Sequence, residues 1–285
     1  MGVTALRWWV SPPRPDELLS SLLSRAAALY ERPPAMLWSS LHEGDSRPWG
    51  DVDAPSCAAL LRMANALGMR ATALHSHRLV DAPWLMVPRA RSSYCPQCWN
   101  LDLEHNRPHI LRRGWSRVLR TKCQIHDQPL LLAQEAWASK SRRLKYPIVQ
   151  LSANEQGILD LIDRFGTVLE QCLYFGAVWP DGWQSTPHHA RSLLVSFTFN
   201  MNSVMDFPPI RNVDPGGNLS RLICGPRRFQ EPISEPTWDA FRSVANPAFR
   251  RAAVWATAWT LIPDLPAAYA PGWFGDLKDR THLSG

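Results

Sequence analysis

Four residues with metal-ligand chemistry, arranged as two short pairs, constrain this 285-residue chain more than any other feature. Cys95 and Cys98 are separated by two residues, and so are Cys123 and His126, with 24 residues between the pairs. This spacing lets both members of a pair face one ion, and three Cys with one His is a set that tetrahedral Zn²⁺ prefers. Four protein ligands leave no open position for water or substrate. The sequence therefore predicts one structural zinc site, whose binding energy helps to fold the segment around it.

The remaining cysteines, Cys57, Cys172 and Cys224, have apolar neighbours and no nearby Cys or His, so we expect buried thiols there. Six cysteines in a chain of this length do not form a disulfide scaffold, which indicates a reducing compartment. No apolar run approaches the roughly 18 residues needed to span a membrane. The apolar stretch at the start of the sequence is too short for a secretory signal. We therefore expect a cytoplasmic protein with no membrane association.

Positive charge is concentrated around the predicted zinc segment. Residues 105–145 carry ten Lys and Arg against two Asp and Glu, whereas the net charge of the whole chain is only +6. Such a cluster is typical of a surface that meets nucleic-acid phosphates or an acidic protein face, although a solvated basic face has the same composition. The candidate nucleic-acid contacts are Arg112, Arg113, Arg117, Arg120, Lys122, Arg142 and Arg143.

Apolar residues at helical spacing predict helices in the N-terminal part of the chain. A helix is expected over 15–30, with acidic residues in its first turn and a stop at the following prolines. Two shorter helices are expected at 56–67 and 70–79, joined by a turn at Gly68. This pair is compatible with a DNA-binding helix-turn-helix, and a plain helical hairpin has the same pattern.

The C-terminal half also has helical signals. Ser152 and Glu155 form a capping box that opens a helix ending at Gly176. Residues 177–236 are rich in Pro and Gly, which predicts loops, short helices and at most one strand pair. A last helical region is expected at 237–262, broken at Pro247.

The expected fold is mainly α, in three parts. These parts are a helix-turn-helix-like region at 1–90, a zinc finger with a basic surface at 91–135 and a helical domain at 136–285. The chain has no P-loop, no H-E-x-x-H and no G-x-S-x-G motif. The polar face of a helix accounts for Asp160 and Asp163. The sequence therefore does not indicate an enzyme.

Several of these segments, taken in chain order, resemble the TniQ family of bacterial transposon target-selection proteins, which are related to the larger TnsD proteins. The similar pieces are PDELLSSLLSRAA, RMANALGMRATALHSHRL, YCPQCW, Trp115 and CQIHDQPLL, which together cover about residues 14–135. Two features depart from the family. Many relatives have a further Cys-x-x-Cys after the His, which is missing here, and Gln124 stands where the family usually has Pro. The resemblance therefore implies one zinc site only.

The resemblance implies a non-catalytic role in transposition. Proteins similar to this one bring the transposon's TnsC-like AAA+ ATPase, and through it the transposase, to a target. Some bind target DNA, and others dock on a CRISPR effector complex with its guide RNA, in some cases as dimers, so a homodimer is among the implied assemblies. The main alternative is a zinc-containing transcription regulator that reads DNA through residues 56–79. A metal-dependent nuclease, with carboxylates that the sequence does not group, is the third reading.

Overall fold

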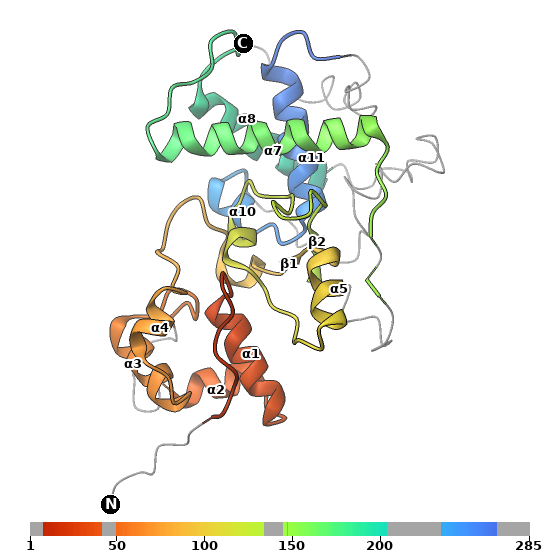
Figure 1. Ribbon diagram of the computed structural model, residues 1–285. Helices are drawn as coiled ribbons and strands as arrows, with labels where there is room; N and C mark the ends of the chain where they lie inside the picture. Colours follow the sequence, from red (N-terminus) through yellow and green to blue (C-terminus); the bar gives the residue numbers. More distant parts are fainter. Residues whose placement is uncertain (1–7, 42–49, 134–144, 147, 204–234, 267–285) are drawn as a thin grey trace, which may run out of the picture. The chain divides into compact units, whose positions relative to one another are not determined.

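The computed structural model describes residues 8–41, 50–133, 145, 146, 148–203 and 235–266, and the structural statements below concern these residues (Figure 1). The chain divides into two compact units. Unit 1 comprises Met1–Pro83 and Leu101–Gly114, and unit 2 comprises Trp84–Asn100 and Trp115–Gly285. The expected boundaries after residues 90 and 135 concern domains, which need not coincide with compact units, and they stay a prediction.

Unit 1 is a small helical unit with its own apolar core. Its helices are α1 (Leu19–Leu29), α2 (Pro34–Ser40), α3 (Cys57–Ala66) and α4 (Ala71–His75). Helix α1 packs on α2, and α3 packs on α4. Leu19, Leu22, Leu23 and Ala26 place one side of α1 in the core, at the spacing that the sequence pattern predicts.

The first helix is shorter than predicted. Helix α1 begins at Leu19 and has no acidic residue in its first turn, and Asp16 lies before it with φ of 63°. Glu17 also precedes the helix, and its fully buried carboxylate binds the guanidinium of Arg25. The expectation of acidic residues in the first turn is therefore wrong, because Asp16 and Glu17 both precede Leu19 and Glu17 is held in a buried ion pair with Arg25.

The chain after α1 follows local backbone preferences. Helix α1 ends at Leu29, and Pro34 then occupies the start of α2, where the fixed φ of proline suits a helix. The predicted pair at 56–67 and 70–79 is present in shorter form as α3 and α4. The Ser56 hydroxyl accepts the amide of Ala59 at the start of α3, and Gly68 adopts φ of 64° between the helices. A helix-turn-helix function for this pair stays a prediction.

Unit 2 combines a small antiparallel strand pair with longer helices. In β1 and β2, Ser93 lies opposite Leu132 and Tyr94 opposite Leu131. The described residues confirm the expected mainly α-helical class. The elements are η1 (Pro88–Ala90), β1 (Ser93–Tyr94), β2 (Leu131–Leu132), α7 (Ala153–Tyr174), α8 (Pro187–Ser203), α10 (Trp238–Arg242) and α11 (Pro247–Leu261), while α5 (Pro96–Glu104) and η2 (Arg113–Ser116) cross the unit boundary.

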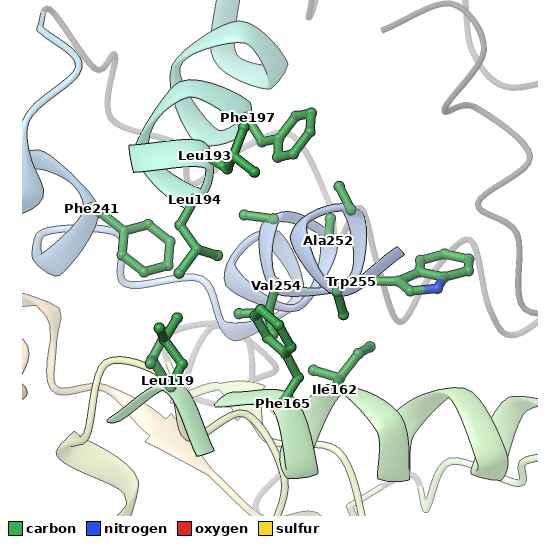
Figure 2. Close-up of a cluster of buried hydrophobic side chains, with 14 of the residues drawn as sticks. Leu119, Ile162, Phe165, Leu193, Leu194, Phe197, Phe241, Ala252, Val254 and Trp255 are labelled. Carbon is green, nitrogen blue, oxygen red and sulfur yellow. The ribbon is translucent and has the colours of Figure 1, made fainter. Parts of the chain in front are cut away.

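The core of unit 2 lies between α7, α8 and α11. Figure 2 shows Phe165 of α7, Leu194 of α8 and Trp255 of α11 among the side chains that fill it. Helix α7 also approaches the chain at Leu119 very closely. A Cβ added to Gly166 would lie 3.0 Å from the carbonyl oxygen of Leu119, so this glycine in mid-helix permits the contact.

Helix caps of unit 2 confirm several sequence signals. Ser152 and Glu155 form the predicted capping box of α7, and the side chain of Asn246 accepts the amide of Ala248 at the start of α11. The expectation for 177–236 is wrong in part, because residues 187–203 form the long helix α8; residues 204–234 lie outside the described residues. Among the described helices, none combines the length and apolar content needed to cross a bilayer.

Candidate metal centre and basic surface

The first ligand pair lies at the start of helix α5. Cys95 immediately precedes Pro96, the first residue of the helix, and its carbonyl oxygen accepts the amide of Trp99 at 3.1 Å. Cys98 is therefore in the first helical turn, beside the sulfur of Cys95. Proline suits this position, and the amide end of a helix favours negatively charged sulfur.

The second ligand pair lies in a tight hairpin. The amide of Cys123 donates to the carbonyl of Gln128 at 2.7 Å, and Lys122 and Pro129 pair as an antiparallel bridge. Asp127 turns the chain with φ of 51°, directly after His126. The loop therefore presents the sulfur of Cys123 and the Nδ1 atom of His126 to the same side.

The ligand atoms of Cys95, Cys98, Cys123 and His126 all lie within 4.8 Å of one another, as the sequence predicts. Tetrahedral zinc, with bonds of about 2.3 Å to sulfur and about 2.05 Å to nitrogen, places two sulfurs about 3.8 Å apart and sulfur and nitrogen about 3.5 Å apart. The Cys98 and Cys123 sulfurs are 3.8 Å apart. His126 Nδ1 is 3.6, 3.2 and 3.9 Å from the sulfurs of Cys95, Cys98 and Cys123. The donors and their separations fit one Zn²⁺ ion.

The electrostatics of the cluster favour thiolate sulfur at Cys123. Hydrogen bonding to Cys95, and then to Cys98 and the backbone amides of Ile125 and His126, lowers the pKa of the Cys123 thiol. The contacts with Cys123 and Cys98, together with burial, raise the pKa of the Cys95 thiol, so Cys95 keeps its proton in competition with Cys123. A cation among the three sulfurs would remove this competition, because metal binding takes the place of protons.

Aromatic side chains form an apolar wall beside the metal ligands. The rings of Tyr94 and Trp99 stack with centroids 4.1 Å apart, and the Tyr146 ring meets the Trp99 ring edge-on at 5.1 Å. Asn100 fixes this part of the chain through two hydrogen bonds to the backbone of Tyr146, of 2.7 and 2.9 Å. Trp99 and Leu130 are both buried.

Three of the candidate nucleic-acid contacts are paired with acidic side chains of α7. Arg117 contacts Glu170, Arg120 Nη1 lies 3.0 Å from Asp163, and Lys122 Nζ lies 2.6 Å from Asp160. Burial lowers the pKa of Lys122, and hydrogen bonds to Asp160 and Asp127 outweigh this effect and raise it. A phosphate at these cations would have to compete with a carboxylate that is already in contact.

Arg112 and Arg113 belong to unit 1 and lie near helix α4. The backbone of Arg112 bridges to that of Glu17, whose carbonyl oxygen is 2.9 Å from Nδ1 of His77. The Arg113 guanidinium donates to the carbonyl of Ser76, the residue that ends α4, and lies 3.4 Å from Asp16. Arg113 is therefore held beside the predicted helix-turn-helix, and Arg112 directly precedes it in the chain. Arg142 and Arg143 lie outside the described residues.

The expectation of buried thiols is wrong at Cys57. Its side chain is exposed because it is the first residue of α3, whose core-facing positions begin with Ala59 and Leu60. Cys172 is half-buried, with its sulfur 3.4 Å from the carbonyl of Val178. Cys224 lies outside the described residues.

Two buried groups with no counterpart in the sequence prediction hold these segments in place. In unit 1, Glu17 binds Arg25 through two hydrogen bonds, of 2.8 and 2.9 Å, and accepts the hydroxyl of Ser21. In unit 2, Arg250 and Arg251 of α11 are buried against the chain around the second ligand pair. Regular spacing of Glu, Ser and Arg at four-residue intervals was the available signal for the first group.

These observations define a mainly α-helical protein with one Cys₃His cluster able to hold a structural metal ion. The profile of the TniQ family matches residues 9–130, a segment that contains all four cluster residues and the Glu17–Arg25 pair. Residues 9–130 therefore form a TniQ domain, as the resemblance of this segment to the TniQ family of transposition target-selection proteins predicts. No curated protein and no solved structure shows significant similarity to the chain.

Proposed function

We propose that this protein selects the target site of a bacterial transposon, without catalysing a reaction itself. It recruits a TnsC-like AAA+ ATPase, and through the ATPase the transposase, to that site in the cytoplasm. The observation that carries the proposal is the TniQ domain over residues 9–130. The Cys₃His cluster supports it, because all four positions around a tetrahedral ion are taken by protein, which suits a structural role.

Zinc has a definite role in this proposal. Cys95, Cys98, Cys123 and His126 hold the ion, which joins the start of α5 to the hairpin at 121–130. The ion supplies only cross-linking energy, and the chain's own residues provide the surfaces that partners meet.

The nucleic-acid contacts proposed for this protein fall into two groups. Arg112 and Arg113 lie in the same unit as α3 and α4, and Arg113 lies beside α4. Both arginines would contact phosphates as positioning contacts, which carry no sequence information. Arg117, Arg120 and Lys122 are engaged with α7, so we expect them to contribute mainly to the stability of unit 2.

Paired variants separate these two groups. We expect Arg112→Ala with Arg113→Ala to weaken binding to duplex DNA and to flatten the dependence of log K on log salt by about 0.9 per lost phosphate contact. The matched control, Arg117→Ala with Arg120→Ala, should lower the melting temperature of unit 2 and leave the salt dependence unchanged. The proposed surface would be refuted if the Arg117/Arg120 variant changed the salt dependence of DNA binding and the Arg112/Arg113 variant changed only the melting temperature.

The target can be reached by two routes, which are direct binding to DNA and docking on an RNA-guided CRISPR effector, with the protein as a monomer or a homodimer. A tagged purification from the native host, with mass spectrometry of proteins and sequencing of bound RNA, tests the function. Recovery of an AAA+ ATPase supports the adaptor function, and Cas proteins with a guide RNA indicate the second route. If neither the ATPase nor Cas proteins are recovered, the result contradicts the proposed adaptor function.

The second candidate is a zinc-containing transcription regulator. The observation that favours it is the helical pair α3 and α4, which is joined through a left-handed Gly68 and is compatible with a helix-turn-helix. High-affinity binding of the isolated protein to a single operator sequence, with no ATPase partner, would support this candidate.

A further inference from the structure

Two adjacent arginines of α11 are buried against the segments that carry the metal ligands. Arg250 and Arg251 are 0% and 1% exposed. Nη1 of Arg251 donates to the carbonyl of Thr121 at 2.9 Å and to that of Leu130 at 2.8 Å. These two residues form the stem of the hairpin that holds the second ligand pair, since the amide of Leu130 also donates to Thr121. One guanidinium therefore spans both sides of the hairpin.

The neighbouring arginine holds the approach to the first ligand pair. Nη2 of Arg250 donates to the hydroxyl of Ser93 at 3.1 Å, and Nη1 donates to the carbonyl of Val118 at 2.6 Å. Ser93 precedes Cys95 by two residues, as Thr121 precedes Cys123. Adjacent residues of one helix thus bind the chain at equivalent positions before both ligand pairs.

Burial of these side chains is expensive for the fold. It lowers the pKa of both guanidinium groups to about 9, so both remain charged at neutral pH inside unit 2. A buried charge is tolerated when hydrogen bonds satisfy it, and an apolar side chain would fill the same volume at a lower cost. Apart from the bond of Arg250 to the Ser93 hydroxyl, these donors point at backbone carbonyls, so what these arginines determine is the path of the chain.

We propose that Arg250 and Arg251 are positioning residues of the metal centre. They hold β1 and the hairpin at the separation at which the two ligand pairs meet one ion. Arg251 follows the last ligand, His126, by 125 residues, and it still belongs to the same compact unit as the centre. Metal binding and the packing of α11 therefore stabilise each other, because linkage between two such events is reciprocal.

The first test uses the full-length protein with Arg251→Lys. Both hydrogen bonds of Arg251 to Thr121 and Leu130 come from Nη1, whose two N–H groups lie in the fixed plane of the guanidinium. Lysine keeps the charge, but its tetrahedral ammonium on a flexible stem does not reproduce these two donor directions. We expect the Kd for Zn²⁺, measured by competition with a chromophoric chelator, to rise about 10–100-fold, as for other residues that orient metal ligands. Co²⁺ in place of Zn²⁺ should show weaker and shifted d–d absorption, because the tetrahedral geometry is relaxed.

The matched control is Leu22→Ala in α1. Leu22 is buried in the separate apolar core of unit 1, so the variant loses stability by leaving a cavity without disturbing the packing of α11. It should keep the Kd for Zn²⁺ and the Co²⁺ spectrum of the wild-type protein. A folded Arg251→Lys protein with both properties unchanged would overturn the proposal.

A second measurement needs no variant, and it applies if Arg251→Lys fails to fold. Hydrogen exchange of the wild-type protein is followed by mass spectrometry with and without a zinc chelator. We expect amides of α11 to lose protection together with the hairpin, while α1 in unit 1 keeps its protection. Unchanged protection of α11 after metal removal, or a wild-type protein with no Co²⁺ absorption, would contradict the proposal, and neither result depends on the role in transposition.

Discussion

The buried ion pair between Glu17 and Arg25 allows a quantitative prediction for unit 1. The Glu17 side chain is 0% exposed and that of Arg25 is 8% exposed, and the two groups share a two-pronged contact. The hydroxyl of Ser21 donates to the same carboxylate and accepts the amide of Leu111, which ties α1 to the chain at 111. Removal of one partner leaves a buried charge without its counter-ion, which costs about 3–5 kcal/mol.

The perturbation is Arg25→Met, which keeps an unbranched side chain and removes the charge. For a unit of this size each kcal/mol lowers the Tm by about 4–8 °C, so the expected fall exceeds about 10 °C. Because two units can unfold separately, the assay is native-state hydrogen exchange of peptides from α1 and α3 at increasing urea. The control is Arg32→Met, an exposed arginine after α1, with an expected effect within about 0.5 kcal/mol.

A double variant tests the physical reason. When Glu17→Gln is added to Arg25→Met, no charge remains buried, so the loss should be smaller than the sum of the single losses. The coupling energy from the double-mutant cycle should lie between about 0.5 and 3 kcal/mol. Arg25→Met that costs no more than Arg32→Met, or strictly additive losses, would refute the reasoning.

Three further predictions concern single positions. Cys98→Ser should abolish stoichiometric zinc, measured by elemental analysis, and lower the Tm of unit 2, because three ligands leave the site incomplete. Gly166→Ala should destabilise unit 2 by about 1–3 kcal/mol in urea unfolding, despite the better helix propensity of Ala, because its Cβ meets Leu119. Burial lowers the pKa of His109, an effect larger than the opposing one of Asp102, so folded unit 1 disfavours the protonated ring. The neutral His109 ring therefore contributes fully to stability above about pH 6.5, the pKa of histidine in the unfolded chain, and this contribution is lost as the pH falls below that value. His109→Gln should flatten the pH dependence of stability measured by urea unfolding.

Signals that depend on a few consecutive residues are predictable from this sequence. The ligand pairs, the capping box at Ser152 and the Asn246 cap all rest on spacings of two to four residues, and the structure has each of them. Helix α8 was missed because its sequence, PHHARSLLVSFTFNMNS, contains β-branched and aromatic residues that also suit strands. In unit 2, burial of Leu193, Leu194 and Phe197 against the core decides in favour of the helix.

Contacts between segments that are far apart in the sequence cannot be predicted from local sequence patterns. Glu17, Ser21 and Arg25 lie four residues apart, a spacing that would place them along one side of a helix. In the structure Glu17 precedes the helix, and its ion pair with Arg25 joins residues eight positions apart. The local sequence around Arg250 and Arg251 carries no signal that two charged side chains are buried there. Only the approach of α11 to the hairpin reveals that both side chains are interior donors.

The basic segment shows how a local charge count misses long-range compensation. Its cations at 117, 120 and 122 face Glu170, Asp163 and Asp160, which lie on one helix and follow them in the chain by 53, 43 and 38 residues. Such pairs bring little net stability where solvent reaches them, but they set which side of α7 meets the metal-binding segment. A nucleic-acid surface is then to be sought among cations that do not face α7. Arg113 is one of them, because its guanidinium lies at the end of α4, with Asp16 as its partner at 3.4 Å.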